Sequence, residues 1–432
     1  MKRDELRARA LSLHRRYEGK WATCSKVRVK TPDDLSLAYT PGVAEPCKKI
    51  DQDPDAVYAY TNRGNLVGVV TDGSAVLGLG NIGPYAAYPV MEGKCVLFKT
   101  FGGLDAVPIC LNTQEVDAIV EHVLLLEPTF GGINLEDIAS PRCFEIERQL
   151  KEKSSIPIFH DDQHGTAVVV AAALLNAAKL AEKEMKSLRV VINGAGAAGL
   201  ATARLLLELG VEALILCDRD GALYEGFPGP MNPEQALLAK QTNPERCRGH
   251  LSEVLPGADV FIGLSAGGVL TSTMVRSMAP RSIVFAMANP EPEIYPEDAR
   301  MGGAWITATG RSDFPNQINN VLAFPGIMAG ALGVRASDIT ASMKRSAAQA
   351  IADCVSEEAL RWDHVIPEVF DPDVAPAVAQ AVARSAIAEG IQRLERDPRA
   401  VADRVRRRVL GSNDRRCEEE PDPDQTGLPP KR

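Results

Sequence analysis

Two pairs of neighbouring acidic residues are the first candidates for chemistry in this 432-residue sequence. Glu136 and Asp137 follow the apolar segment GGINL, and Asp161 and Asp162 follow the strand-like IPIF within FHDDQHGTA. Carboxylates at strand ends can converge on one cleft, and three of them suit a hard cation such as Mg²⁺ or Mn²⁺ with positions open for substrate oxygens. Acid pairs are also common as solvated surface groups or helix caps, so the pattern alone leaves both interpretations open.

Two histidines, His160 and His164, flank the second acid pair. Imidazole nitrogens are zinc ligands, so a zinc site is one interpretation. A pair four residues apart on a loop more often has a structural role, which is the interpretation we favour.

A glycine-rich segment, INGAGAAG, has the pattern of a dinucleotide-binding turn. The motif consists of Gly194, Ala195, Gly196, Ala197, Ala198 and Gly199. It follows the strand-like LRVVIN, opens the helical LATARLLLELG and precedes a second strand, VEALILCD, which is the full context that this motif requires. The glycines allow a tight turn and close approach of the pyrophosphate to the backbone, and the helix N-terminus attracts the phosphates.

The second strand of this unit ends in Asp218. A carboxylate at this position can accept hydrogen bonds from both ribose hydroxyls, and it would repel the 2′-phosphate of NADP. The sequence therefore favours NAD, although the neighbouring Arg219 could contact a phosphate, which leaves NADP possible.

The remaining segments predict the elements that position these residues. DVFIGL and SIVFAMANP continue the alternation of strands and helices, which indicates a doubly wound parallel sheet. Earlier in the chain, NLVGVVT, KCVLFKTF and PIFHDD are predicted to be strands and EVDAIVEHVLLLEPTF a helix. Helices are also predicted from Thr166 to Met185 and from Ser337 to about Leu410. The polar final segment, NDRRCEEEPDPDQTGLPPKR, is predicted to be disordered.

Composition excludes several classes of function. The net charge of -9 argues against a nucleic-acid-binding protein, which needs clustered excess Lys and Arg. The charged start of the chain has no apolar core of a secretory signal, and the longest apolar run, Ala167 to Leu175, is shorter than the roughly 20 residues that cross a bilayer. Nine single cysteines without a C-x-x-C pair indicate reduced thiols. We therefore expect a cytoplasmic protein with a small-molecule substrate and no nucleic-acid or membrane partner.

A series of longer segments resembles the malic enzymes of the short bacterial type. They are SLAYTPGVAEPC, LGLGNIGP, MEGKCVLFKTFGG, INLEDI, FHDDQHGTA, INGAGAAG, ANPEPEI, TGRSDFPNQINN and VLAFPG, and they stand in the family's order from about Leu35 to Gly330. The resemblance implies oxidative decarboxylation of malate to pyruvate and CO₂ with reduction of NAD(P), dependence on Mg²⁺ or Mn²⁺, and decarboxylation of oxaloacetate. It also implies a homodimer in which active-site residues can come from both subunits.

The resemblance further implies roles for individual residues. Glu136, Asp137 and Asp162 would be the metal ligands. Tyr39 would be the general acid, and Lys94 would be the general base and contact the substrate. Asn289 would contact the cofactor and Asn320 the substrate, with Asp161 and Asn319 as supporting residues. Oxidation requires the C2 hydroxyl of malate to lose its proton, which a lysine can accept if burial and a nearby cation lower its pKa. A metal would polarise the C2 carbonyl for loss of CO₂, and a tyrosine hydroxyl could then protonate C3. Taken singly, Tyr39 and Lys94 would more often be a packing residue and a solvated charge before a strand.

We expect two domains, because 432 residues are too many for one small core, and the pattern of elements predicts that both are α/β. We expect an N-terminal mixed α/β malic-type domain at residues 1–163 and a doubly wound Rossmann-like NAD(P)-binding domain at 164–395. Residues 396–432 would contain the end of the C-terminal helix and the tail.

Two departures from the family pattern concern the substrate carboxylates. Larger malic enzymes have an arginine in the segment that reads TDGSAVLG here, where Ala75 takes its place. The short type shares this lack, and Lys99 and Arg311 are candidates to replace the arginine. After FPG the chain reads IMAGAL, where the short type more often has an aromatic residue and an arginine.

Three other functions stay open on the sequence. A malolactic-type enzyme would keep its cofactor bound and release lactate. An amino-acid dehydrogenase also combines a catalytic lysine with a dinucleotide domain, but it needs no metal. A catalytically silent nucleotide-binding protein is disfavoured because Tyr39, Lys94 and the acidic residues are all present.

Overall fold

Two parallel β-sheets organise the computed structural model of this protein, which describes residues 3–414. The first sheet contains β1 (Leu66–Thr71), β2 (Asp105–Cys110), β3 (Gly132–Leu135) and β4 (Ile158–His160). Its strand order is β2-β1-β3-β4, and all three pairings are parallel. β1, β3 and β4 are almost entirely buried, as expected for apolar strands in a parallel sheet covered by helices.

The second sheet is the predicted doubly wound sheet. It contains β5 (Arg189–Asn193), β6 (Ala213–Asp218), β7 (Gly221–Ala222), β8 (Val260–Gly263), β9 (Ile283–Ala286) and β10 (Ile306–Thr309). The order is β10-β9-β8-β5-β6-β7, and only the β6–β7 pairing is antiparallel. The chain winds from β5 to β6 on one side and continues with β8 on the other, so the carboxyl end of β5 lies at the switch point where α/β sheets bind ligands.

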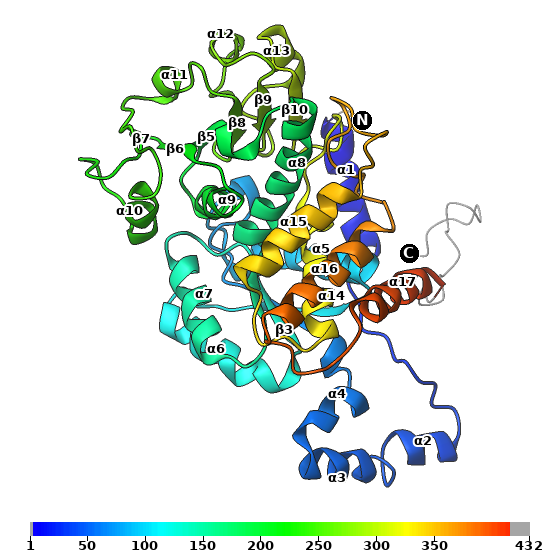
Figure 1. The fold of residues 1–432 in the computed structure, drawn as a ribbon. Helices are drawn as coiled ribbons and strands as arrows, with labels where there is room; N and C mark the ends of the chain where they lie inside the picture. Colours follow the sequence, from blue (N-terminus) through cyan, green and yellow to red (C-terminus); the bar gives the residue numbers. More distant parts are fainter. Residues whose placement is uncertain (1–2, 415–432) are drawn as a thin grey trace.

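Helices surround both sheets (Figure 1). The first part of the chain contains α1 (Arg3–Arg16), α2 (Pro32–Ala38), α3 (Ala44–Gln52), α4 (Val57–Tyr60), α5 (Gly83–Gly102), α6 (Val116–Leu126) and α7 (Arg142–Lys153). The second part contains α8 (Thr166–Leu180), α9 (Ala197–Glu208), α10 (Pro233–Ala239), α11 (Leu251–Val254), α12 (Ser272–Arg276), α13 (Pro296–Met301), α14 (Phe324–Gly333), α15 (Ala341–Asp353), α16 (Val374–Ala388) and α17 (Pro398–Asp414).

The main core runs through both parts of the chain. Every residue of α14 is buried, and α8 is buried along nearly its whole length. α14 packs against α16 and also against α5 of the first part. None of the helices between residues 3 and 414 has the length and apolar character needed to span a bilayer.

The structure corrects the prediction that KCVLFKTF is a strand, because this segment lies inside α5. The buried positions of α5 in and around this segment, Met91, Cys95, Phe98 and Gly102, recur every three or four residues and form one apolar stripe on the helix. Lys94 therefore lies in the middle of a helix and does not precede a strand. The predicted C-terminal helical region is also interrupted, since α15, α16 and α17 are separated by irregular segments. Residues 415–432 of the predicted disordered tail lie outside the described residues.

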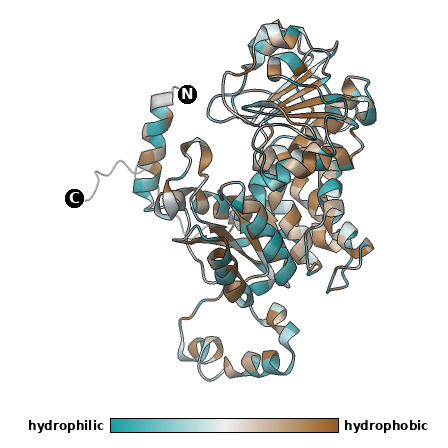
Figure 2. Ribbon diagram, turned by 90° about the vertical axis from the view of Figure 1, so that its left-hand side faces the viewer, coloured by the Kyte–Doolittle hydropathy of each residue, from teal (hydrophilic) through white to brown (hydrophobic). Residues whose placement is uncertain are grey.

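An N-terminal arm, which we define as residues 32–60, projects from the body of the molecule (Figures 1 and 2). It contains α2, α3 and α4, and no residue of these three helices is buried. Its side chains include the exposed Leu35, Leu37, Tyr39 and Tyr60. The arm therefore has no core of its own within one chain.

Candidate active site

The acidic residues meet at the carboxyl edge of the first sheet. β3 lies between β1 and β4 with parallel pairing, so the residues that follow β3 and β4 emerge side by side. Oxygen atoms of Glu136, Asp137 and Asp162 all lie within 4.8 Å of one another. The structure thus brings together the three carboxylates that the sequence analysis proposed as metal ligands.

Hydrogen bonds hold this cluster in place. Asn134 donates a side-chain hydrogen bond to Glu136 (2.8 Å), and the backbone N–H of Asp137 donates to Asp162 (2.7 Å). The backbone N–H of Ala75 donates to the carbonyl of Asp137 (2.9 Å). One oxygen of Asp137, Oδ2, is buried without a hydrogen-bond partner. A buried, unpaired carboxylate oxygen among other hard oxygen donors fits Mg²⁺ or Mn²⁺.

The electrostatics of the cluster also fit a cation. Burial raises the pKa of Glu136 well above its ordinary value; the attraction of Lys94 opposes this shift and repulsion from Asp162 adds to it. Burial and then the negative charge of Asp162 raise the pKa of Asp137 to about 7. Neighbouring carboxylates cannot all ionise easily unless a positive charge lies between them.

Lys94 reaches the cluster from α5. Its Nζ lies 2.6 Å from Asp161 Oδ2 and 2.8 Å from Glu136 Oε1, and 4.2 Å from the centre of the Phe324 ring. Burial alone would lower the pKa of Lys94, but Asp161 and Glu136 raise it above its ordinary value. A general base would need a lowered pKa. The contacts with Asp161 and Glu136 favour the protonated amine instead.

Asp161 is positioned by the π-helical turn Asp161–Gly165 that follows β4. Its carboxylate accepts hydrogen bonds from Lys94 and from the Asn320 side chain (3.1 Å). A Cβ atom on Gly165 would lie 1.8 Å from Asp161 Oδ1, so only glycine leaves room for this carboxylate. Asn320 therefore lies at the site, whereas the Asn319 side chain accepts a hydrogen bond from the backbone of Val321 and caps the turn.

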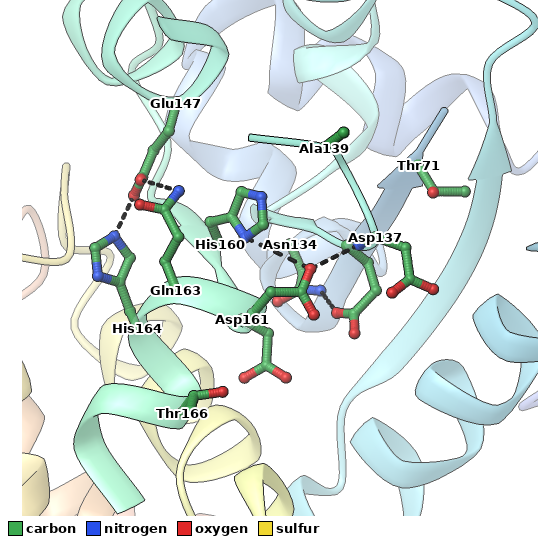
Figure 3. Close-up of polar contacts among 12 residues, drawn as sticks. Thr71, Asn134, Asp137, Ala139, Glu147, His160, Asp161, Gln163, His164 and Thr166 are labelled. Carbon is green, nitrogen blue, oxygen red and sulfur yellow. Dashed lines mark hydrogen bonds and ion pairs between the residues drawn. The ribbon is translucent and has the colours of Figure 1, made fainter. Parts of the chain in front are cut away.

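A buried polar network lies behind this turn, and the sequence analysis missed it (Figure 3). Glu147 accepts hydrogen bonds from Gln163 (3.1 Å) and from His164 (2.7 Å), and Lys344 lies 3.2 Å from the other ring nitrogen of His164. Burial lowers the pKa of His164 to about 4, although Glu147 opposes the shift. Burial thus favours the neutral form of His164. His160 is fully buried, with its Nδ1 3.8 Å from Asp162 Oδ2. No histidine belongs to the ligand cluster found among the described residues.

The glycine-rich turn has the geometry expected for a bound pyrophosphate. Gly194 follows β5, and Ala197 begins α9. Side chains at two of the glycines would collide with the backbone. A Cβ on Gly194 would lie 2.2 Å from the carbonyl oxygen of Leu264, and a Cβ on Gly199 would lie 1.8 Å from the carbonyl oxygen of Gly194. Nothing lies within 4 Å of a Cβ built on Gly196, so the backbone there is open to a ligand.

Asp218 ends β6 and is held by a residue that the sequence analysis did not identify. Gln235 of α10 donates hydrogen bonds to Asp218 (2.8 Å) and to the carbonyl of Ala195 (3.0 Å), which ties the strand end to the glycine-rich turn. The sequence NPEQ could have indicated a helix that begins here, because Asn232 and Gln235 form a capping box at the start of α10.

The loop after β1, in the first part of the chain, contacts the loop after β9 in the second part. Asn289 follows β9, is exposed and lies near Gly78, whose Cβ would be 3.2 Å from the Asn289 carbonyl oxygen. Arg311 lies beside it and donates to the Pro290 carbonyl (2.8 Å) and to Asp313. Lys99 is instead paired with Asp105 (2.6 Å), so its amine is already engaged by a carboxylate of this chain.

Tyr39 is the one proposed catalytic residue that lies apart from the cluster. It follows α2 in the N-terminal arm, and its side chain is 66% exposed. Among the described residues, no contact connects its hydroxyl with the carboxylate cluster. One chain alone therefore does not assemble the complete set of residues.

The fold and the site together define a dinucleotide-binding enzyme with a carboxylate cluster suited to a divalent cation. Comparison with protein families assigns residues 18–151 to the malic enzyme N-terminal domain, in two overlapping matches, and residues 163–387 to the malic enzyme NAD binding domain. The chain belongs to the malic enzyme family.

Individual relatives agree with this assignment. The bifunctional malic/malolactic enzyme of Bacillus subtilis is 60% identical over 94% of this chain and 99% of the relative. The NAD-dependent malic enzyme of Geobacillus stearothermophilus is 54% identical over 88% of this chain and 79% of the relative. The crystal structure of malic enzyme from Pyrococcus horikoshii is 46% identical and superposes with a TM-score of 0.90, covering 95% of this chain and 97% of that one.

Proposed function

We propose that this protein oxidises malate with NAD, or NADP, and decarboxylates the product to pyruvate and CO₂, in dependence on Mg²⁺ or Mn²⁺. The observation that carries the proposal is the cluster of Glu136, Asp137 and Asp162 in contact with Lys94. Membership of the malic enzyme family supports it, and it decides against the amino-acid dehydrogenase that the sequence left open. The same site would decarboxylate oxaloacetate, since this acid is the expected product of the oxidation step.

The three carboxylates would hold the metal, and the turn after β5 would hold the nicotinamide cofactor. When bound, the metal would polarise the C2 oxygen of the substrate and favour loss of the C4 carboxylate, and the nicotinamide would accept the hydride. Asn320 would orient the substrate next to Lys94, and its hydrogen bond to Asp161 supports this role. Asn289, in the loop after β9, would contact the cofactor.

Lys94 would accept the proton of the C2 hydroxyl. Asp161 and Glu136 lie within 2.8 Å of its Nζ and raise its pKa, so they favour the protonated amine. A cation among the carboxylates would compensate their charge, and the pKa of Lys94 would then fall towards the range of a base. Lys94 would thus serve as a base only in the loaded site.

Tyr39 would act in the active site of a second copy of the chain, as the general acid that protonates C3. The N-terminal arm buries none of the residues of its three helices, and its apolar side chains need a partner surface. Exposed apolar residues also lie in the segment after β1, namely Leu77, Leu79 and Tyr85, and the backbone of Leu77 is hydrogen-bonded to Asp137. In a homodimer with two-fold symmetry, each arm could cover the other subunit's site.

We also propose the division into domains at residues 1–163, 164–395 and 396–432, and a cytoplasmic location. The family matches, which change from one domain to the other between residues 151 and 163, support the first boundary. The unpaired cysteines of the described chain support a reducing compartment.

The test is an assay at 340 nm with malate, NAD or NADP, and Mn²⁺. We expect a steady rise in absorbance that stops after a chelator is added and is absent in the Lys94→Ala variant. Other 2-hydroxy acids serve as controls for the substrate. Unchanged activity of Lys94→Ala would contradict the proposal, and so would full activity without a metal.

A malolactic reaction is the second candidate, because the name of the Bacillus subtilis relative includes it. In that reaction the NADH would stay bound and reduce pyruvate to lactate. Measuring lactate and NADH in the same assay separates the two reactions. Lactate without net NADH would favour the malolactic reaction.

A further inference from the structure

Cationic side chains gather around α17, on a surface that contains none of the metal-site residues. Two cavities of about 390 and 750 Å³ lie against this helix. Four arginines line the smaller cavity: Arg335, Arg396, Arg404 and Arg407. The described residues that line it include no acidic side chain. Arg404 and Arg407 also line the larger cavity, together with Arg408, Lys20, Lys26 and Lys99, against the single acid Asp105.

The charges around the smaller cavity are poorly compensated. Arg335 has a carboxylate nearby, 3.5 Å away on Asp55, and it lies over the Tyr58 ring. Arg396 donates to a neutral partner, the carbonyl of Gly333 (2.8 Å). Arg404 has no carboxylate partner within the described part of the chain.

The surroundings of Arg404 are positive as well as partly buried. Burial, followed by repulsion from Arg408, Arg396 and Arg407, lowers the pKa of Arg404 to about 10. Holding several guanidinium groups together without anions is unfavourable, because each one loses hydration and repels its neighbours. Such an arrangement points to an anionic ligand that the chain itself does not provide among the described residues.

We propose that the cavity lined by Arg335, Arg396, Arg404 and Arg407 binds a small polyanion with two or more carboxylate or phosphate groups. The planar guanidinium group binds both kinds of group through paired hydrogen bonds. A volume of about 390 Å³ suits a small metabolite. Tyr58 and Leu332 provide an apolar wall for its carbon skeleton.

This site is connected to the active site through α5. α17 packs against α5, and a Cβ on Gly103, the residue after α5, would lie 2.4 Å from Arg408 Cβ. Lys94 lies on the same helix. A bound anion would therefore stabilise α17 on the helix that carries Lys94.

The test is thermal unfolding of the purified full chain with pyrophosphate or citrate, at an ionic strength kept constant with NaCl. We expect Tm to rise by roughly 3 °C at a hundredfold excess over Kd. The double variant Arg404→Gln/Arg407→Gln should lose this rise. Without ligand it should be no less stable than the parent chain, because it removes repelling charges. Arg399→Gln, on the same helix but outside both cavities, should keep the full rise.

Three outcomes would overturn the proposal. The first is an equal rise in Tm in the double variant, which would mean that the anion binds elsewhere, for example in the active site. The second is an equal rise in Tm with NaCl alone. The third is a rise in Tm with the anion in a chain that ends at Asp414 but not in the full chain. In that case a free anion would not be the ligand of this cavity in the full chain. If the double variant does not fold, Arg396→Gln provides the same comparison.

Discussion

At the scale of single residues, the site is governed by the repulsion among buried carboxylates. Glu136, Asp137 and Asp162 would destabilise the fold if all were ionised without a counter-charge. Lys94 compensates part of this charge, and it does so by contacts with Glu136 and with Asp161. The same four acids and one lysine would therefore account both for the proposed binding of a cation and for the raised pKa of the proposed base.

Replacing Asp162 by Asn tests the metal role. We expect turnover to fall by about a hundredfold or more, because a neutral amide is a weaker ligand for a hard cation, while NAD affinity stays nearly unchanged. Steady-state kinetics at saturating Mn²⁺ and calorimetric titration with NAD provide the two measurements. A parallel loss of both would show that Asp162 supports the fold rather than the metal.

Metal binding should release protons in a pH-dependent way. The pKa of Asp137, about 7 in the metal-free fold, lies above its ordinary value of 3.8. The stability that this group contributes is thus present below its ordinary pKa and is lost as the pH rises through about 7. Mn²⁺ needs the ionised form, so its affinity should rise with pH across the same window.

Calorimetry in buffers with different ionisation enthalpies measures this release. We expect about one proton or more at pH 6 and clearly fewer at pH 8.5. Lys94 would also give up a proton when the metal binds, and this release would persist at pH 8.5. Absence of proton release at pH 6 would contradict the raised pKa of Asp137.

Cofactor choice also depends on one residue. We expect the carboxylate of Asp218 to face the ribose of the cofactor, and Gln235 donates a hydrogen bond to it. Asp218→Ser should therefore reduce the preference for NAD, measured as the ratio of kcat/KM values, by about tenfold or more. Asp220→Ser, two residues along the chain, serves as the control. An unchanged ratio would remove Asp218 as the discriminating residue.

At the scale of elements, the turn after β4 matters because it aims Asp161 at Lys94. Its geometry depends on Gly165, since a Cβ there would lie 1.8 Å from the Asp161 carboxylate. Gly165→Ala should displace this carboxylate, lower kcat and destabilise the protein by about 1–3 kcal/mol. Gly93→Ala in α5 is the matched control, because its Cβ would meet only Lys20, at 3.7 Å. It should be neutral or stabilising by up to about 1 kcal/mol.

Thermal unfolding and steady-state assays of both variants check this prediction. A Gly165→Ala protein as active and stable as the control would show that Asp161 can move at no cost.

Elements also show where sequence patterns were sufficient. The strand, turn, helix and strand around the glycine-rich motif were predicted correctly, because their apolar periodicity and turn residues agree. KCVLFKTF was predicted wrongly, since a run of eight residues rich in β-branched, aromatic and aliphatic side chains cannot be distinguished by composition from about two turns of a buried helix. The apolar stripe that identifies the helix runs from Met91 to Gly102, so it extends beyond both ends of KCVLFKTF.

At the scale of the whole molecule, the position of the N-terminal arm leads to a prediction about the dimer. If Tyr39 acts in the partner's site, Tyr39→Phe and Lys94→Ala chains should each be inactive alone. Mixed dimers would contain one site with both native residues. Unfolding and refolding the two chains together at equal amounts should then recover about a quarter of the parent activity.

Refolding each variant alone under the same conditions is the control. Recovery of no activity in the mixture would contradict a shared site. Sedimentation must in addition show dimers, because a monomer with full activity would exclude the arrangement altogether.

The sequence by itself determined the chemistry available to this protein. The spacing of the glycines, the identity of Asp218 and the acid pairs after apolar segments are local features, and strand periodicity was enough to place them at strand ends. Family resemblance then supplied the roles of Tyr39 and Lys94, which no local pattern could give.

Only the tertiary structure decided which of these groups meet. The distances from Lys94 to Glu136 and Asp161 join segments far apart in the chain, so they depend on how α5 packs across the sheet. Burial and mutual charge then set the pKa values of the cluster, and both are properties of the folded state. The same packing leaves Tyr39 on an arm without a core, because a single chain lacks the surface that would cover it.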